Sequence, residues 1–152
     1  MTSVEASPGS AAVSKVELAS PAWMELLRDL LQAYAARTPA DLELSLCEKF
    51  TGVPAHLDRN GDGTLAWHCV IKNGRAAFGE GVLADADLFS QADYEFIRKV
   101  ATWIYTPDVM AEVDAYKASG VANGQYRPGG RDPAKVPVLF REMHNELARR
   151  TL

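Results

Sequence analysis

The spacing of apolar residues predicts a helix near the start of the chain. Ser20-Pro21 supplies a serine N-cap followed by proline at the first helical position, and both features favour a helix start. Trp23 and several leucines then recur every three or four residues as far as Tyr34, and Thr38-Pro39 interrupts the pattern. We expect a helix whose apolar face serves either the core or a homodimer interface, since one sequence does not separate these two uses.

Alternation of apolar and polar residues predicts strands in the middle of the chain. In residues 64–72, every second residue from Leu65 onward is apolar. Asn60-Gly61 and Asn73-Gly74 are turn signals on either side, because these residue types tolerate the positive φ of tight hairpins. The expected antiparallel meander consists of residues 53–59, 64–72 and 75–81.

Residues 41–50 have two interpretations. Leu42, Leu44 and Leu46 alternate with polar residues, as in a half-buried strand. Thr38 and the residues after it also make a helix start, and Leu42, Leu46 and Phe50 fit one helix face. We favour a short helix here, because residues typical of strands begin only at Val53.

The second half of the chain combines short strands and helices. Residues 86–90 and 121–127 are candidates for a fourth and a fifth strand. Helices are expected from Asp93, as N-cap, to Ile104, from Pro107 to Gly120, and over the closing segment that contains Leu139 and Leu147. A run of strands with helices before and after it predicts an α+β fold, an antiparallel β-meander sheet of about five strands with helices packed on one face.

Composition and charge exclude several classes of function. Hydrophobic residues make up 47% of the 152 residues and charged residues 24%, and the net charge is −4, which argues against nucleic acid as a partner. Insertion into a membrane is not expected, because the chain has no apolar run near the roughly 18 residues that a span needs. Cys47 and Cys69 are too few for a disulfide scaffold, so we expect free thiols.

The first 19 residues differ from the rest of the chain. Residues 1–19 are mostly small and polar, and they lack the basic start and the continuous apolar stretch of a secretory signal. We therefore expect a disordered N-terminal arm, followed by a single domain over residues 20–152. With no targeting motif in the sequence, a cytoplasmic location is the expectation.

The middle of the chain resembles the sterol carrier protein 2-like (SCP2-like) family. Residues 67–74 (WHCVIKNG) resemble the family's tryptophan-led central strand, which runs into a turn at a glycine. Residues 85–94 (DADLFSQADY) resemble its passage from a polar strand through an acidic residue into a helix. The similarity covers residues 50–125 and concerns topology more than motifs. It implies a small cytoplasmic protein with a hydrophobic tunnel between a five-stranded sheet and its helices.

Large apolar side chains supply the candidate binding residues. A sheet face covered by loosely packed helices leaves an apolar cavity, which binds apolar ligands with few polar contacts. The candidates are Trp67, Ile71, Phe78, Leu88, Phe96, Trp103, Ile104, Met110, Phe140 and Met143.

Candidate catalytic and metal-binding residues form no recognised motif. Asp58 begins a sequence like a calcium loop, but its twelfth position is Cys69 instead of glutamate, so we interpret it as a polar turn. If the hairpin loop is Gly61 to Gly63, His56 lies opposite His68, whereas a loop one residue longer removes this pairing, and no ligand spacing supports a metal. We expect no metal and no cofactor. The candidates for a general base are His68, Asp93 and Glu80.

Two functions agree with these features. The first is binding or carriage of a hydrophobic, lipid-like or aromatic small molecule in an apolar cavity between sheet and helices. The alternative is a small cofactor-independent enzyme, an isomerase, lyase or hydrolase, that uses a His or Asp general base in the same cavity. The absence of a catalytic motif favours the first function.

Overall fold

One five-stranded sheet organises residues 14–152, which are the residues that the computed structural model describes. Its strands are β1 (Leu44–Thr51), β2 (Leu65–Lys72), β3 (Arg75–Glu80), β4 (Leu88–Asp93) and β5 (Tyr126–Gly129). Their order across the sheet is β3-β2-β1-β4-β5. The central strand, β1, therefore pairs with a neighbour on each side.

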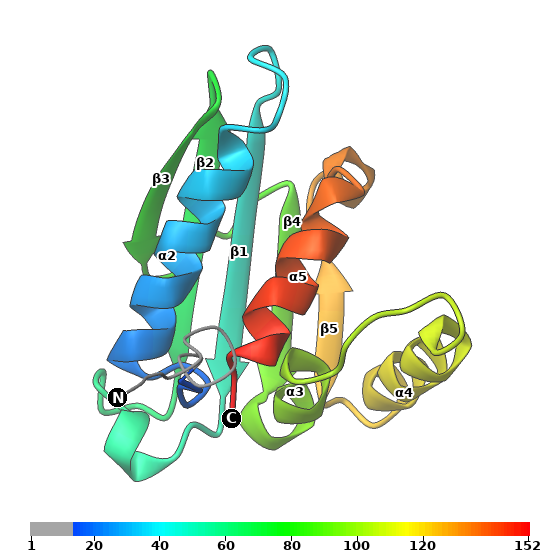
Figure 1. The fold of residues 1–152 in the computed structure, drawn as a ribbon. Coiled ribbons are helices and arrows are strands. Elements are labelled where there is room, and N and C mark those ends of the chain that lie inside the picture. The colour runs from blue at the N-terminus through cyan, green and yellow to red at the C-terminus, as the bar shows by residue number, and fades with distance from the viewer. Residues whose placement is uncertain (1–13) are drawn as a thin grey trace, which may run out of the picture.

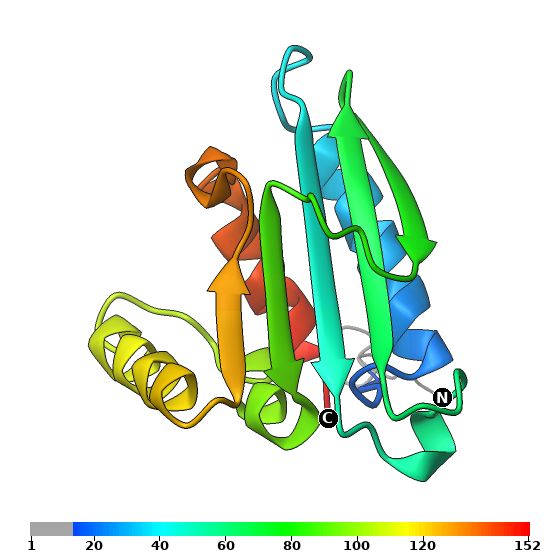
Figure 2. The same cartoon turned by 180° about the vertical axis from the view of Figure 1, so that it is seen from behind.

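One pair of neighbouring strands is parallel, so the prediction of a purely antiparallel meander is wrong. β1 and β4 run parallel, whereas the other three pairs are antiparallel. After β3 the chain does not turn back beside that strand. It crosses the sheet through residues 81–87 and enters β4 on the far side of β1 (Figure 2). This crossover places β1 at the centre of the sheet, where its side chains are covered.

Helices cover one face of the sheet. They are α2 (Pro21–Ala35), α3 (Tyr94–Ala101), α4 (Met110–Ala122) and α5 (Leu139–Arg149). α2 and α5 lie across the same face, α3 lies near the end of β4, and α4 lies outward of β5 (Figures 1 and 2). The predicted α+β class and the five strands are confirmed.

The first predicted helix is confirmed as α2. The Ser20 hydroxyl accepts a hydrogen bond from the Trp23 backbone N–H at 3.1 Å, as an N-cap does, and proline occupies the first turn. Trp23, Leu27 and Leu31 are buried in the core. The apolar face of this helix is therefore used by the core, which answers the question that the sequence left open.

Residues 41–50 are not a helix, so the favoured interpretation of this segment is wrong. Residues from Leu44 onward form β1, and their pairing with β2 and β4 supplies backbone hydrogen bonds on both sides. Strand alternation places Leu44, Leu46, Glu48 and Phe50 on one face, and the three apolar members are buried. Glu48 therefore faces the same side as the core.

Residues 53–59 do not form a strand, which corrects the predicted hairpin. Pro54 has no N–H to donate to a sheet, and Ala55–Leu57 form a short 3-10 helix. The Asp58 carboxylate accepts hydrogen bonds from the N–H groups of Gly61 and Gly63, both at 2.9 Å, and holds a polar turn. The hairpin joins β1 to β2, so Cys47 and not His56 lies opposite His68.

The second half of the chain has the predicted order of elements with shifted bounds. The strand expected over residues 86–90 is β4, and the strand expected over 121–127 is β5. Gly120 allows α4 to approach α3, because a Cβ at this position would overlap the ring of Phe96. Both cysteines are free and buried.

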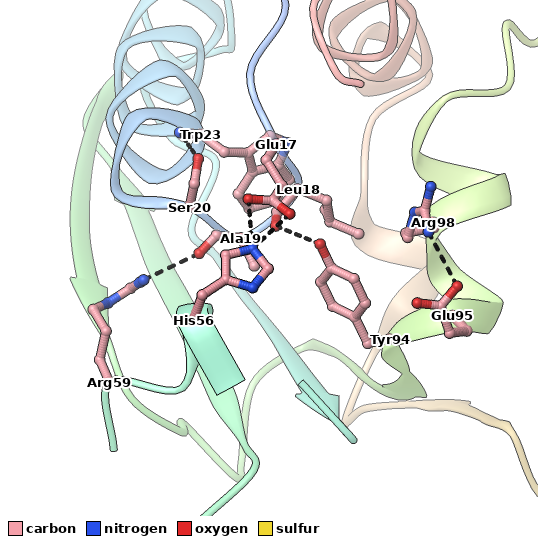
Figure 3. A network of polar contacts seen from close by, with 10 residues as sticks. All are labelled: Glu17, Leu18, Ala19, Ser20, Trp23, His56, Arg59, Tyr94, Glu95 and Arg98. Atoms are coloured by element: carbon pink, nitrogen blue, oxygen red, sulfur yellow. Dashed lines mark hydrogen bonds and ion pairs between the residues drawn. The ribbon is translucent and has the colours of Figure 1, made fainter. Parts of the chain in front are cut away.

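The segment before α2 packs against the core, so the predicted disordered arm is wrong for its last residues. Val16 forms a parallel bridge with Thr151, and Leu18 and Ala19 are buried. Figure 3 shows that the Tyr94 hydroxyl donates to the Leu18 carbonyl oxygen at 2.9 Å. The prediction of disorder assumed that this segment buries too little apolar surface to offset the entropy lost on ordering. Apolar burial and these backbone contacts offset that loss. Residues 1–13 of the predicted arm lie outside the described residues.

The contact between Tyr94 and the chain before α2 leads to a stability prediction. Replacing Tyr94 by phenylalanine should lower the free energy of unfolding by about 1 kcal/mol, because the buried Leu18 carbonyl loses its donor. Urea unfolding followed by circular dichroism measures the change. Tyr105→Phe is the control, since within residues 14–152 its hydroxyl makes no hydrogen bond, and any loss of stability in this variant should stay below about 0.5 kcal/mol. Equal losses in the two variants would contradict the assigned contact.

Candidate functional site

A cavity of about 550 Å³ lies between the sheet and the helices that cover it. Leu46, Trp67 and Leu88 contribute from three adjacent strands, while α3, α4 and α5 supply further apolar side chains. The exposed residues Asp114 and Arg141 also line it, so the cavity meets solvent between α4 and α5. Its size lies within the roughly 300–1,000 Å³ that is usual for small-molecule sites.

Glu48 is a carboxyl group in this mostly apolar wall. Its Oε1 accepts a hydrogen bond from the indole N–H of Trp67 at 2.9 Å. Burial raises the pKa of Glu48, while the Trp67 hydrogen bond and the positive charge of Lys117 act in the opposite direction. Within residues 14–152 its other carboxylate oxygen, Oε2, makes no hydrogen bond or ion pair. Glu48 therefore keeps one free oxygen inside the cavity.

Two tyrosines and a lysine line the same cavity as Glu48. Burial raises the pKa of Tyr126 to about 12 and also raises that of Tyr105, and the charge of Glu48 contributes to both shifts. The Lys117 ammonium lies 5.3 Å from the ring centre of Tyr105, and burial lowers its pKa. The cavity lining therefore contains donor groups as well as the free oxygen of Glu48.

His144 on α5 lines the cavity as a neutral imidazole. Its Nε2 lies 2.8 Å from the backbone carbonyl oxygen of Trp103, which only accepts, so Nε2 carries the proton. The ring stacks on Tyr105 with 3.8 Å between centroids. Burial lowers the pKa of His144 to about 4, although its hydrogen bond to Trp103 acts against that shift. The Nδ1 atom therefore keeps an available lone pair near pH 7.

The charges around the cavity are of both signs. Among the described residues, the charged side chains that line it are Glu48, Asp114, Lys117 and Arg141. Glu48 and Lys117 lie in its interior, whereas Asp114 and Arg141 are exposed at the mouth. These two acidic and two basic groups leave no excess of either formal charge for a charged ligand to neutralise.

Comparison with solved structures identifies the fold. A crystal structure of sterol carrier protein 2 matches with a TM-score of 0.55 and 16% identity, over 90% of this chain and 100% of that one. The solution structure of a conserved hypothetical protein from Thermus thermophilus matches with a TM-score of 0.50 and 17% identity, over 89% and 92% of the two chains. The chain has the SCP2-like fold. Neither a protein-family model nor a curated protein matches the sequence.

Within the SCP2-like fold, the predicted binding residues divide into two groups. Five of them line the cavity: Trp67, Leu88, Met110, Phe140 and Met143. The remaining five lie outside its lining: Ile71, Phe78, Phe96, Trp103 and Ile104.

Aromatic stacking explains why three of the predicted residues do not reach the cavity. Phe78 stacks against Trp67 with 6.1 Å between ring centroids. Phe96 stacks on Tyr116 at 4.6 Å, and Trp103 meets the same tyrosine edge-on at 5.8 Å. These rings bury their apolar area against one another. The faces of these rings are therefore covered by neighbouring aromatic side chains and do not line the cavity.

The predicted general bases lie apart from the cavity. His68 lies on the uncovered face of β2, with its Nδ1 2.9 Å from the Gly81 carbonyl oxygen. Glu80 accepts from Arg59 at 3.2 Å. Asp93 immediately precedes α3, and its side chain makes no capping hydrogen bond. The structure does not bring these three residues together, so no observation supports the enzymatic alternative at those positions.

The polar residues of the cavity were missed by the sequence analysis. Glu48 had a signal, because it continues the alternation of Leu44 and Leu46 if the segment is interpreted as a strand. Interpreting it as a helix concealed that signal. His144 and Lys117 lie on separate helices and had no local signal, because only the folded arrangement brings them to one cavity.

Within residues 14–152, no group of three or more His, Cys, Asp and Glu side chains gathers as a metal site would require. Among the described helices, none combines the length and apolar character that crossing a bilayer requires.

Proposed function

We propose that this protein binds and carries a hydrophobic, lipid-like or aromatic small molecule in the cavity between its sheet and its helices. The observation that carries the proposal is the cavity itself, about 550 Å³ with walls from the sheet and the helices α2, α3, α4 and α5. The similarity of fold to a protein named as a sterol carrier supports it. The net charge of −4 and the two free cysteines agree with a proposed cytoplasmic location.

The physical driving force is burial of apolar surface. A ligand that buries about 400 Å² gains about 10 kcal/mol at roughly 25 cal/mol per Å². Loss of translational and rotational freedom subtracts at least about 4 kcal/mol. The remaining 6 kcal/mol or so corresponds to a Kd of tens of micromolar. A cavity of this kind therefore suits reversible carriage.

A direct test uses the neutral fluorescent probe N-phenyl-1-naphthylamine. The parent protein should bind the probe with a Kd of about 10–100 μM. Ala101 lines the cavity, so Ala101→Trp should fill part of it and weaken binding at least about tenfold. Fluorescence titration gives both values.

The matched control is Ala118→Trp, which places the same side chain on the exposed face of α4. This variant should bind the probe like the parent. Failure of the parent to bind, together with no apolar molecule co-purifying by native mass spectrometry, would overturn the proposed function. Equal weakening by the two variants would show that the probe binds outside the cavity.

A further inference from the structure

The interior of the cavity contains several polar groups that lack partners. Within the described part of the chain, the Glu48 Oε2 atom, the Lys117 ammonium and the hydroxyls of Tyr105 and Tyr126 make no hydrogen bond. The Ser90 hydroxyl also lines the cavity, on the strand next to Glu48. The first four of these side chains are half-buried in the cavity wall, so they keep only part of their contact with water, and an apolar ligand that fills the cavity would remove the rest. Their presence on one cavity lining therefore favours a ligand that carries a polar atom.

The position of Glu48 makes it the centre of this group. On β1 it pairs with Trp67 on one side and with Ser90 on the other. The indole N–H of Trp67 occupies one carboxylate oxygen and fixes the orientation of the group. The charges of Glu48 and Lys117 attract one another across the cavity, but within residues 14–152 the two groups form no ion pair. Among the described residues, Glu48 and Lys117 therefore do not serve as hydrogen-bond partners for each other.

We propose that Glu48, with the hydroxyls of Tyr105 and Tyr126 and the ammonium of Lys117, forms a head-group subsite for the hydroxyl of an otherwise apolar alcohol or phenol. This inference rests on the proposed carrier function and adds the chemical class of the ligand. A hydroxyl donates one hydrogen bond and accepts others, so it satisfies the free Glu48 oxygen and a neighbouring donor together.

The hydroxyl also fits both protonation states of Glu48. An ionised carboxylate accepts the hydroxyl proton, while a protonated carboxyl donates to the hydroxyl oxygen. A ligand carboxylate meets repulsion from ionised Glu48 and attraction from Lys117, and a ligand amine meets the reverse, so the lining favours neither charge. Either charged head would also lose its hydration on entering an apolar cavity. A neutral head that both donates and accepts is therefore the best match to these groups.

The test compares three probes that share one ring system: 2-naphthol, naphthalene and 2-naphthoate. Isothermal titration calorimetry at pH 7 should show that the parent protein binds 2-naphthol about tenfold more tightly than either of the others. Glu48→Leu should weaken the binding of 2-naphthol about tenfold. The same variant should bind naphthalene as tightly as the parent protein or more tightly. Glu48→Gln keeps an acceptor of the same shape, so it should lose less 2-naphthol affinity than Glu48→Leu.

The control for loss of a glutamate is Glu112→Leu on the exposed side of α4, which should bind all three probes like the parent. Circular dichroism melting establishes whether each variant is folded. If Glu48→Leu is unfolded, the comparison of Glu48→Gln with the parent protein provides the test. Naphthalene binding with no preference for 2-naphthol and no dependence on Glu48 would overturn the head-group subsite alone. Tighter binding of 2-naphthoate than of 2-naphthol would overturn it too. Absence of binding by every probe would overturn the carrier function as well.

Discussion

Replacing Gly130 by alanine is expected to lower the free energy of unfolding by about 3 kcal/mol. Gly130 has a φ of +114°, which L side chains rarely adopt. A Cβ at this position would overlap the backbone carbonyl oxygen of Asp87 and lie 2.7 Å from the backbone nitrogen of Phe89. Backbone strain and overpacking each cost about 1–3 kcal/mol, and both apply here. Urea unfolding followed by circular dichroism measures the loss.

Gly124→Ala provides the matched control for Gly130→Ala. Gly124 also has a positive φ, +76°, but no atom lies within 4 Å of a Cβ built there. Its substitution should therefore cost only the backbone strain, about 1 kcal/mol. Equal losses in the two variants would contradict the close approach at Gly130. A loss below about 1 kcal/mol in Gly130→Ala would contradict both its strain and its packing.

The Gly130 contact matters for the cavity because it holds the loop that leads to the cavity mouth. The backbone N–H groups of Arg131 and Asp132 donate to the carbonyl oxygens of Ala86 and Asp87, each at 2.9 Å. The buried Asp87 carboxylate accepts from the Ser45 N–H at 2.9 Å and pairs with Arg131. Gly130→Ala should therefore also weaken probe binding, since residues 136–138 of this loop line the cavity.

The second large effect is loss of stability in mild acid, caused by His144. An unfolded histidine takes up its proton near pH 6.5, whereas the pKa of folded His144 is about 4. Between these values the unfolded state binds more protons, so stability falls as the pH falls and is fully present above pH 6.5. The full shift corresponds to roughly 3 kcal/mol. We expect a loss of that order between pH 6.5 and 4.

The contribution of His144 is isolated by His144→Gln. Glutamine keeps an N–H donor for the Trp103 carbonyl oxygen but does not titrate. The free energy of unfolding of this variant should depend less on pH. Subtracting its pH profile from that of the parent cancels the contribution of the carboxyl groups that both proteins contain. Proton NMR of the imidazole should give a titration midpoint near pH 4. A midpoint near 6.5, with parallel stability profiles, would contradict this account.

Several parts of the fold could be predicted because their signals are local. The serine cap and Pro21 specify the start of α2, and the hydrogen bond from the Trp23 N–H to Ser20 confirms them. The alternation from Leu65 to Ile71 specifies β2, and Asn73-Gly74 specifies the turn into β3. Each of these features depends on residues a few positions apart, so the sequence alone contains the information.

The candidate site could be predicted only in part. Apolar character identified Trp67 and Phe140 among the lining residues, but it equally selected Phe96, which stacks on its neighbours instead. Glu48 was not identified, because its segment was interpreted as a helix. Its location became evident only when β1 was found between β2 and β4.

The amino-acid sequence by itself determined the elements that have strong local signals, such as α2, β2 and the turn into β3, since caps, periodicity and turn residues act over short distances. Only the tertiary structure decided that β4 runs parallel to β1 and that Leu18 joins the core. It also decided that Glu48, Tyr105 and His144 share one cavity. The reason is that strand pairing and cavity formation depend on contacts between distant residues, whose free energy is gained only when the whole chain packs together.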